Sequence, residues 1–336
     1  MTNNEPRLYQ KFANLNGHGM TEQYFYLHQH TSDFDEFCAN ALNWNLDYRQ
    51  LEHGPFTSQM LTCGNSQVIF SRANLGRRML QRGSSPPGLV TFGLLASPDI
   101  TIYWRNRDVS GEQLFIFPPG GELNSISQAN FDVFVISLTE VTLDRVCTSF
   151  QLPEFRKLVE EHEVFQSDPL MLASFREYLL HTEQIFTTRQ QLINKAYLKQ
   201  LENELSEQVI RLLAQSAQPI TANKRRKRDI ALRSAINYIQ ESGHNIITMP
   251  QLCELSNVSQ RTLEYAFRER YGLTPKEYTL IHRLNSVRKL LRAADPEKKQ
   301  VSEIAQQHGF WHMGQFSASY RKLFAELPSQ TLRRVS

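Results

Sequence analysis

The feature that most constrains this 336-residue chain is a short helix, a tight turn and a longer helix, a pattern that occurs twice in its last third. In the first occurrence, residues 248–270, Thr248 and Gln251 have the spacing of a capping box, which predicts a helix start. Asn257 follows this short helix, and asparagine tolerates the left-handed backbone of a tight turn. Ser259 can then cap the next helix. This order of elements predicts a helix-turn-helix unit.

The pattern recurs over residues 301–324, which predicts an internal duplication. Leu263 and Phe316 occupy equivalent inward positions in the two units, 53 residues apart. Between the units, a proline within another capping box opens a long helix over 275–293. Its roughly 19 residues correspond to about 28 Å at 1.5 Å per residue, and successive major grooves on one face of B-DNA lie about 34 Å apart. One chain could therefore reach two adjacent major grooves.

Charge is distributed unequally along the chain, although the net charge is only +3. Residues 1–222 carry 17 Lys+Arg and 24 Asp+Glu, whereas residues 223–336 carry 20 and 10. The first part of the chain is therefore acidic and the last third is strongly basic. This distribution indicates that the last third binds a polyanion. The boundary is predicted at a basic linker, 223–228. Its five consecutive positive charges, Lys224 to Arg228, are either a solvated tether or contact phosphate as well.

The last third also carries apolar, glycine and cap residues at fixed spacing: Leu252, Leu255, Ser259, Leu263, Phe267, Gly272, Tyr278, Arg283, Leu284, Leu290, Leu291, Ile304, Ala305, Gly309, Phe310, Phe316, Phe324 and Pro328. Through these residues and their spacing, residues 229–334 resemble the DNA-binding domain of the AraC/XylS family of transcription regulators. Two positions depart from the family pattern, since Asn257 and Leu327 stand where glycine is frequent. The stretch 309–316 also resembles the ethanolamine-utilisation regulator within that family. The resemblance implies an all-α domain, 229–336, with two helix-turn-helix units.

Outward-facing residues of the two longer helices are the candidate DNA contacts: Gln260, Arg261, Glu264, Tyr265, Arg268, His312, Met313, Gln315, Ala318, Arg321 and Lys322. In the first helix, Arg261 suits bidentate contact with guanine and Glu264 can accept from cytosine, whereas Arg268 is better placed for phosphate. The alternative is that Arg261 and Glu264 are ordinary solvated residues.

The second longer helix is poorer in hydrogen-bonding groups. Gln315 suits adenine, and Met313 or Ala318 can meet a thymine methyl group. Ser319 lies on the same outer face, and Arg321 and Lys322 are placed for phosphate. Trp311 either packs on the connecting helix or approaches DNA. We expect this helix to contribute more by position and phosphate contact than by base readout.

The acidic first part of the chain is predicted to be β-rich over residues 56–140, because short β-prone runs alternate there with turn signals. This spacing favours a small antiparallel barrel or sandwich, and the family resemblance implies a cupin-like barrel. A helix over residues 33–52 is expected to precede the β-rich segment. Residues 141–216 are predicted to be helical, with Asp168 capping one helix that has proline at its first position.

A second helix in this segment, about 189–215, carries an apolar stripe with near-heptad spacing: Leu198, Leu201, Leu205, Val209 and Leu212. The stripe either packs onto the barrel or the preceding helix, or forms a dimer seam. The predicted fold class is therefore α+β with two domains. The first, 1–222, is an effector-sensing and dimerisation domain, and the second is an all-α double helix-turn-helix.

The residues that would mark an enzyme are missing from the sequence. His28 and His30 resemble half of a metal site, but no histidine occurs between His53 and His162 to complete it. There is no phosphate-binding glycine loop, nucleophile elbow or HExxH pair. The four cysteines lie far apart, which favours free thiols in a reducing cytosol. We predict no catalytic residue, no metal and no cofactor.

The effector-binding residues cannot be assigned from sequence. Aromatic residues of the β-rich segment are candidates, although most are expected in the core: Phe70, Phe92, Tyr103, Trp104, Phe115, Phe117, Phe131 and Phe134. Arg72, Arg105 and Arg107 could meet an anionic ligand, or lie on the surface.

The sequence thus predicts a cytoplasmic, sequence-specific transcription regulator that binds double-stranded DNA, is an activator and responds to a small-molecule effector of unknown identity. The family resemblance implies contact with RNA polymerase; a homodimer is possible, and no membrane association is expected. One alternative is a constitutive architectural DNA-binding factor without a ligand. Another is a small-molecule enzyme with a DNA-binding tail.

Overall fold

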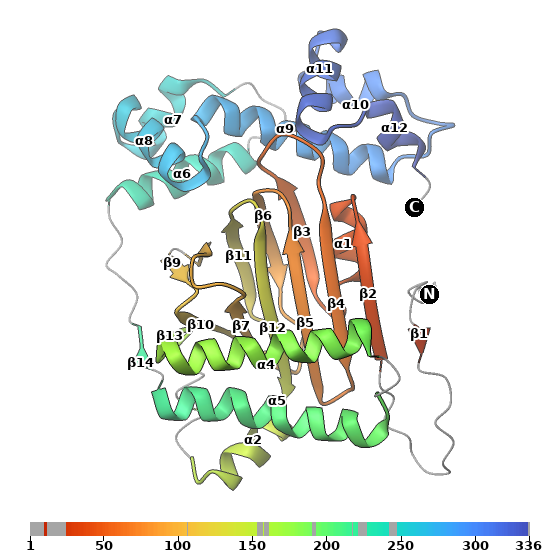
Figure 1. Cartoon of the computed structure of the whole chain (residues 1–336). Helices are drawn as coiled ribbons and strands as arrows, with labels where there is room; N and C mark the ends of the chain where they lie inside the picture. Colours follow the sequence, from red (N-terminus) through yellow and green to blue (C-terminus); the bar gives the residue numbers. More distant parts are fainter. Residues whose placement is uncertain are drawn as a thin grey trace. The chain divides into compact units, whose positions relative to one another are not determined.

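The computed structural model describes residues 10–11, 25–105, 107–152, 157, 161–189, 193–216, 218–220, 227–241 and 247–334. The chain divides into two compact units. The N-terminal unit is drawn from residues 1–48, 57–76 and 81–222, and the C-terminal unit from residues 49–56, 77–80 and 223–336. The first unit is rich in β-strands and the second is helical from Lys227 onward (Figure 1).

The larger sheet of the N-terminal unit has nine strands. Their order is β1 (Gln10–Lys11), β2 (Phe25–Thr31), β4 (Ser58–Gly64), β5 (Val68–Leu75), β12 (Phe131–Thr139), β7 (Leu89–Leu95), β10 (Gln113–Phe117), β13 (Val164–Gln166) and β14 (Gln218–Pro219). At its centre, Ile136 of β12 lies opposite Phe70 of β5 and Phe92 of β7. All three side chains are buried, so this row forms part of the core.

The smaller sheet has five strands, in the order β3 (Asn45–Gln50), β6 (Met79–Ser84), β11 (Glu122–Ser127), β8 (Thr101–Trp104) and β9 (Arg107–Ser110). In the part of the chain that the structure describes, no strand pairing joins this sheet to the larger one. The predicted barrel is therefore two separate sheets and is not closed. Strands also extend beyond the predicted β-rich segment, 56–140, since β2 and β3 precede it and β13 follows it.

The prediction of one helix over 33–52 is wrong for its second half. Helix α1 (Phe34–Asn40) is capped by Asp33, whose side chain accepts from the backbone N–H of Asp35 at 2.9 Å. The chain then turns at Asn43, which has a φ of 59°, and continues as β3. Helical spacing ends where the alternation of Leu46 with Tyr48 begins, and alternation is the pattern of a strand with one buried face.

After β12, the described part of the chain contains the helices α2 (Glu140–Ser149), α4 (Pro169–Thr188) and α5 (Lys195–Ser216). Asp168 caps α4 as predicted, accepting from the backbone N–H groups of Leu170 and Met171 at 2.9 and 3.0 Å. Helices α4 and α5 lie side by side (Figure 1). Their apolar faces join the core of the two-sheet unit.

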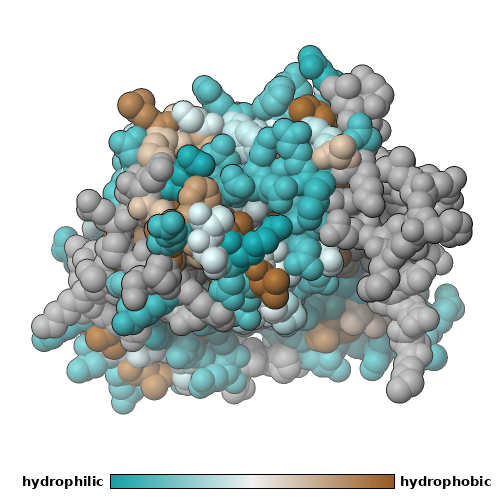
Figure 2. All heavy atoms as spheres, turned by 90° about the horizontal axis from the view of Figure 1, so that it is seen from below, coloured by the Kyte–Doolittle hydropathy of each residue, from teal (hydrophilic) through white to brown (hydrophobic). Residues whose placement is uncertain are grey.

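The apolar stripe of α5 belongs to this core. Its five residues, Leu198, Leu201, Leu205, Val209 and Leu212, are all at most 6% exposed. Figure 2 views the side on which α5 and α2 lie, and most of its described residues are hydrophilic, with scattered hydrophobic ones. The packing alternative is therefore the one found, and this stripe does not present a seam to a second copy of the chain.

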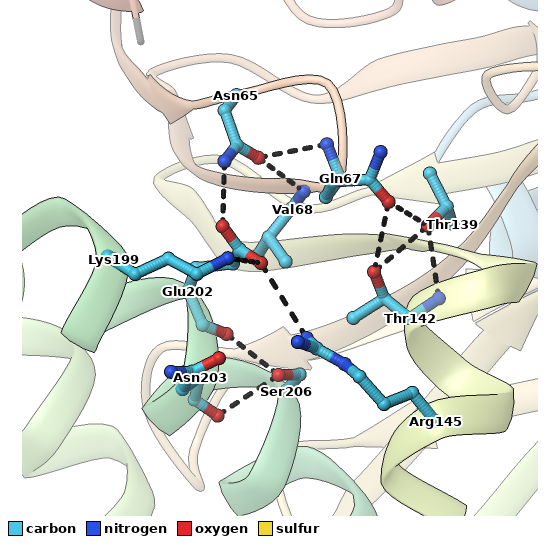
Figure 3. A network of polar contacts seen from close by, with 10 residues as sticks. All are labelled: Asn65, Gln67, Val68, Thr139, Thr142, Arg145, Lys199, Glu202, Asn203 and Ser206. Carbon is cyan, nitrogen blue, oxygen red and sulfur yellow. Dashed lines mark hydrogen bonds and ion pairs between the residues drawn. The ribbon is translucent and has the colours of Figure 1, made fainter. Parts of the chain in front are cut away.

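A buried carboxylate on the same helix fixes α5 to its neighbours (Figure 3). Glu202 is 4% exposed and accepts from the side-chain amide of Asn65, in the β4–β5 turn, at 2.8 Å. Its other oxygen lies 3.0 Å from the Lys199 ammonium and 3.6 Å from the Arg145 guanidinium of α2. These polar contacts link α5 to the β4–β5 turn and to α2.

The C-terminal unit contains α6 (Lys227–Glu241), α7 (Met249–Ser256), α8 (Gln260–Tyr271), α9 (Pro275–Ala293), α10 (Val301–Gln307), α11 (Met313–Phe324) and α12 (Pro328–Arg333). Helix α6 packs on α7 and α8, and α9 contacts both this group and α10 with α12. The last two residues of the predicted linker, Lys227 and Arg228, begin α6. Its other positively charged residues, Lys224 to Arg226, lie outside the described residues.

Helix α11 ends at a non-glycine residue in left-handed conformation, which makes a test of local stability possible. Ala325 has a φ of 58°, and its N–H donates to the carbonyl of Arg321 at 2.8 Å. We expect Ala325→Gly to raise the free energy of unfolding by about 0.5–1 kcal/mol, because glycine adopts this backbone without strain.

Urea denaturation would measure this gain. The matched variant Ala318→Gly, within the same helix, should instead lose about 1 kcal/mol. Equal losses in both variants would contradict the assigned helix end.

Candidate functional site

The first helix-turn-helix unit consists of α7 and α8. Thr248 donates its backbone N–H to the Gln251 side chain at 2.9 Å, which is the return contact of the predicted capping box. Asn257 ends α7 with a φ of 50°, as predicted for the tight turn. Leu263 and Phe267 of α8 are fully buried. The opposite face of α8 is therefore directed away from the core.

The structure places most candidate residues of α8 on that outer face. Gln260, Arg261, Tyr265 and Arg268 are exposed and Glu264 is half-buried. The Gln260 amide donates to the Glu264 carboxylate at 2.8 Å, so a base amino group would compete with Gln260 for this acceptor. Within the described ranges, Arg261 has no ion-pair partner. Its guanidinium is thus available to a ligand.

One contact of this face involves the basic segment. The Arg228 guanidinium lies 5.5 Å from the centre of the Tyr265 ring and 2.8 Å from the Glu269 carboxylate. These contacts attach the start of α6 to the recognition face. No local sequence pattern predicts this pairing, because Arg228 and Glu269 are 41 residues apart. Arg228 therefore has a structural role beyond that of a tether.

The second unit, α10 and α11, repeats the arrangement. Phe316 and Tyr320 are buried, and the Tyr320 hydroxyl lies 2.8 Å from the Thr331 hydroxyl of α12. On the outer face, the exposed candidates are His312, Gln315, Ala318, Arg321 and Lys322, whereas Met313 is half-buried. The candidate residues of both units thus share one property, an outer position on the second helix of the pair.

Trp311 lies at the start of the second recognition element and is 68% exposed. With Gln315, it lines a groove of about 550 Å³ whose other wall is α9, including Leu280 and Arg283. Trp311 therefore borders the connecting helix without being buried against it. Both of its predicted alternatives remain compatible with this position.

The connecting helix α9 joins the two helix-turn-helix units. It begins with the predicted capping box, in which the Thr274 N–H donates to the Glu277 carboxylate at 2.8 Å and lowers the pKa of Glu277. Arg283 donates to the His308 carbonyl at 2.8 and 2.6 Å and lies 4.3 Å from the centre of the Phe310 ring. The 19 residues of α9 therefore set a fixed spacing between two recognition faces.

The N-terminal unit contains a cavity of about 80 Å³. Both sheets and α1 line it. Four of the aromatic candidates do so, namely Trp104, Phe115, Phe117 and Phe131. Phe70, Phe92 and Phe134 lie in the core instead. Sequence reasoning missed Trp44 and Tyr48, which line the cavity from around β3, because that segment was expected to be helical.

The arginines considered as ligand contacts form ion pairs with carboxylates of the same chain. Arg72 pairs with Asp132 at 2.7 Å and also with Glu183. Arg105 pairs with Glu163, and Arg107 lies 4.0 Å from the same carboxylate. None of the three lines the cavity. An anionic ligand there would find no cation among them.

The histidine pair of β2 does not form a metal site with other described groups. The His28 and His30 rings lie 5.0 Å apart, and His28 Nε2 lies 3.1 Å from the Gln59 amide nitrogen. Burial and the neighbouring His30 lower the pKa of His28. No cluster of three or more metal-ligating side chains occurs in the described ranges. Nor does any described helix have the length and apolar character needed to cross a membrane.

Comparison with known proteins places this geometry among DNA-binding regulators. A family profile described as "Helix-turn-helix domain" matches residues 252–334. The "XylDLEGF operon transcriptional activator" of Pseudomonas putida is 26% identical over 227 residues, covering 66% of this chain and 67% of that protein.

Two solved structures are also similar. A probable AraC family transcriptional regulator from Rhodopseudomonas palustris CGA009 is 32% identical; the match covers 31% of this chain and 95% of that one, with a TM-score of 0.29. The AraC-like transcriptional activator CuxR is 13% identical and is covered to 98%, with 83% of this chain matched and a TM-score of 0.42.

The two helix-turn-helix units on one connecting helix define a DNA-binding transcription regulator. The similar proteins are regulators, not enzymes. These features, the helix-turn-helix profile over residues 252–334 and the similarity to the Pseudomonas putida activator place the C-terminal unit in the AraC/XylS family of transcription regulators. The predicted family is thus confirmed. The narrower resemblance to the ethanolamine-utilisation regulator stays a prediction.

Proposed function

We propose that this protein activates transcription by reading two adjacent major grooves, under the control of a small organic effector. The observation that carries the proposal is the pair of outward faces on α8 and α11, held apart by the 19 residues of α9. Base readout falls mainly to Arg261 and Gln315. Arg268, Arg321 and Lys322 bind phosphates, and the remaining candidates support these contacts.

The N-terminal unit is the proposed effector domain, because it contains a cavity lined mainly by apolar side chains. Effector control requires that the ligand bind the DNA-competent arrangement more tightly than the other arrangement. The relatives' described roles as activators support contact with RNA polymerase. A homodimer would have to use a face other than the apolar stripe of α5. The site of action would be the cytoplasm, where the DNA lies.

Genome-wide mapping of sites bound by the full chain tests this proposal. We expect a limited set of sites with a shared sequence of two half-sites about one helical turn apart, upstream of genes whose expression falls when the regulator is deleted. Uniform occupancy without a shared sequence would instead favour a constitutive architectural factor. The cavity argues for the effector-controlled alternative, since an architectural factor needs no ligand site.

The phosphate contacts can be tested separately from base readout. Lys322→Ala should weaken binding to all DNA sequences alike and reduce the slope of log affinity against log salt by about 1, because one fewer phosphate is neutralised. Fluorescence anisotropy at several salt concentrations would measure both effects.

Lys298→Ala is the matched control, since Lys298 already lies 3.0 Å from the Asp295 carboxylate. A slope unchanged by Lys322→Ala would remove Lys322 from the phosphate contacts.

A further inference from the structure

The cavity of the N-terminal unit has a chemically specific wall. Its aromatic part consists of Trp104, Phe115 and Phe117, whose rings lie 5.3–5.9 Å apart, with Trp44 edge-on to Phe117 at 5.5 Å. Strands β5 and β12 of the larger sheet add small or aliphatic side chains, including Ala73 and Val135. Aromatic rings combined with small and aliphatic groups favour a flat, apolar ligand.

Two buried N–H donors in this wall have no hydrogen-bond partner in the described part of the chain. They are Trp104 Nε1 and Gln81 Nε2, on side chains that are 0% and 3% exposed and that both line the cavity. The other end of the Gln81 amide is occupied, because its oxygen accepts from the Ser125 hydroxyl at 3.1 Å. A buried donor left unpaired is costly, so both nitrogens require an acceptor.

The two donors belong to one row across the smaller sheet. Ser125 of β11 lies directly opposite Trp104 of β8, and its side chain contacts Gln81 of β6 on the other side. Residues opposite each other on adjacent strands point to the same face of a sheet. One ligand on that face can therefore meet both donors.

The lining contains no charged side chain. All 23 lining residues are apolar, aromatic, hydroxyl- or amide-bearing, and none is Asp, Glu, Lys, Arg or His. An ionised ligand would lose its hydration without gaining a counter-ion, which is strongly unfavourable. The ligand that fits is therefore uncharged.

We propose that the cavity binds an uncharged aromatic compound with one hydrogen-bond acceptor, such as a carbonyl oxygen, held by Trp104 Nε1 and Gln81 Nε2. This inference rests on the proposed effector function and specifies its ligand class. A carbonyl oxygen has two lone pairs and can accept from both nitrogens, while the ring packs on Phe115 and Phe117.

Three probes of similar size separate the elements of this inference. Acetophenone is uncharged and has an acceptor, ethylbenzene lacks the acceptor, and benzoate is charged at pH 7. In titration calorimetry with the full chain, acetophenone should bind about five- to twentyfold more tightly than ethylbenzene, because it forms one or two further hydrogen bonds. Benzoate should bind on the order of tenfold or more weakly than acetophenone.

Variants then assign the donors. Trp104→Phe keeps an aromatic ring and removes the N–H, and Gln81→Met keeps the length and removes the amide. Each should weaken acetophenone binding about fivefold and leave ethylbenzene binding unchanged. Trp311→Phe, in the C-terminal unit and outside the cavity, is the matched control and should change neither. The melting temperature of each variant verifies that it folds.

The outcomes separate this inference from the proposed function. Equal affinity for acetophenone and ethylbenzene, tighter binding of benzoate, or no binding of any probe at millimolar concentration would overturn the ligand class. The proposed function would still stand if the full chain bound its mapped sites and a different compound altered that binding. If no compound altered it, effector control itself would fail, whatever the cavity binds.

Discussion

Replacing Glu326 with alanine is expected to lower the free energy of unfolding of the C-terminal unit by about 3–5 kcal/mol, because it removes the carboxylate beside a buried guanidinium. Arg288 of α9 is only 3% exposed, and its Nε lies 3.3 Å from the Glu326 carboxylate. The same carboxylate accepts from the Thr331 hydroxyl at 2.7 Å and pairs with Arg334 at 3.0 Å. Glu326 thus links α9 to α12 by polar contacts beside the second helix-turn-helix unit.

Urea denaturation, with hydrogen exchange of the α9 and α11 amides, would measure this loss. Arg334→Ala removes only the partly exposed member of the network and should cost less than about 1 kcal/mol. Adding Arg288→Met to Glu326→Ala should recover part of the stability, since an apolar side chain tolerates burial. A loss below 1 kcal/mol in Glu326→Ala would show that Arg288 does not depend on this carboxylate.

The features that the sequence predicted best are those determined by neighbours along the chain. The caps at Asp168, Thr248 and Thr274 and the turn at Asn257 are all present. Each depends on contacts within about four residues, so the identity of those residues is sufficient. The outer faces of α8 and α11 followed for the same reason, because the 3.6-residue period fixes which side chains lie opposite Leu263 and Phe316.

The features that were missed depend on pairing between distant segments. Residues 45–50 form β3 because they pair with β6, and helical spacing in the preceding residues concealed this. Period-2 alternation indicates that one face of a strand is buried, but not which strand lies opposite. The cavity therefore could not be located from sequence, nor could the row formed by Gln81, Ser125 and Trp104.

Replacing Arg261 with alanine is expected to weaken specific DNA binding by about 1–3 kcal/mol and to relax the sequence preference at one base pair. Arg261 is exposed on the outer face of α8, and a guanidinium can donate two parallel hydrogen bonds to O6 and N7 of guanine. Fluorescence anisotropy with a mapped site and its single-base variants would measure the affinity and the preference together.

Arg268 provides the contrast, because it is exposed on the same helix two turns further along but is proposed to contact phosphate. Arg268→Ala should weaken binding to all of these DNA sequences by a similar factor and leave the sequence preference intact. Arg261→Lys keeps the positive charge and loses the planar fork, so it should retain non-specific affinity while losing the preference. If Arg261→Ala and Arg268→Ala gave the same uniform loss, α8 would be held by the backbone alone, and the base readout would have to come from α11.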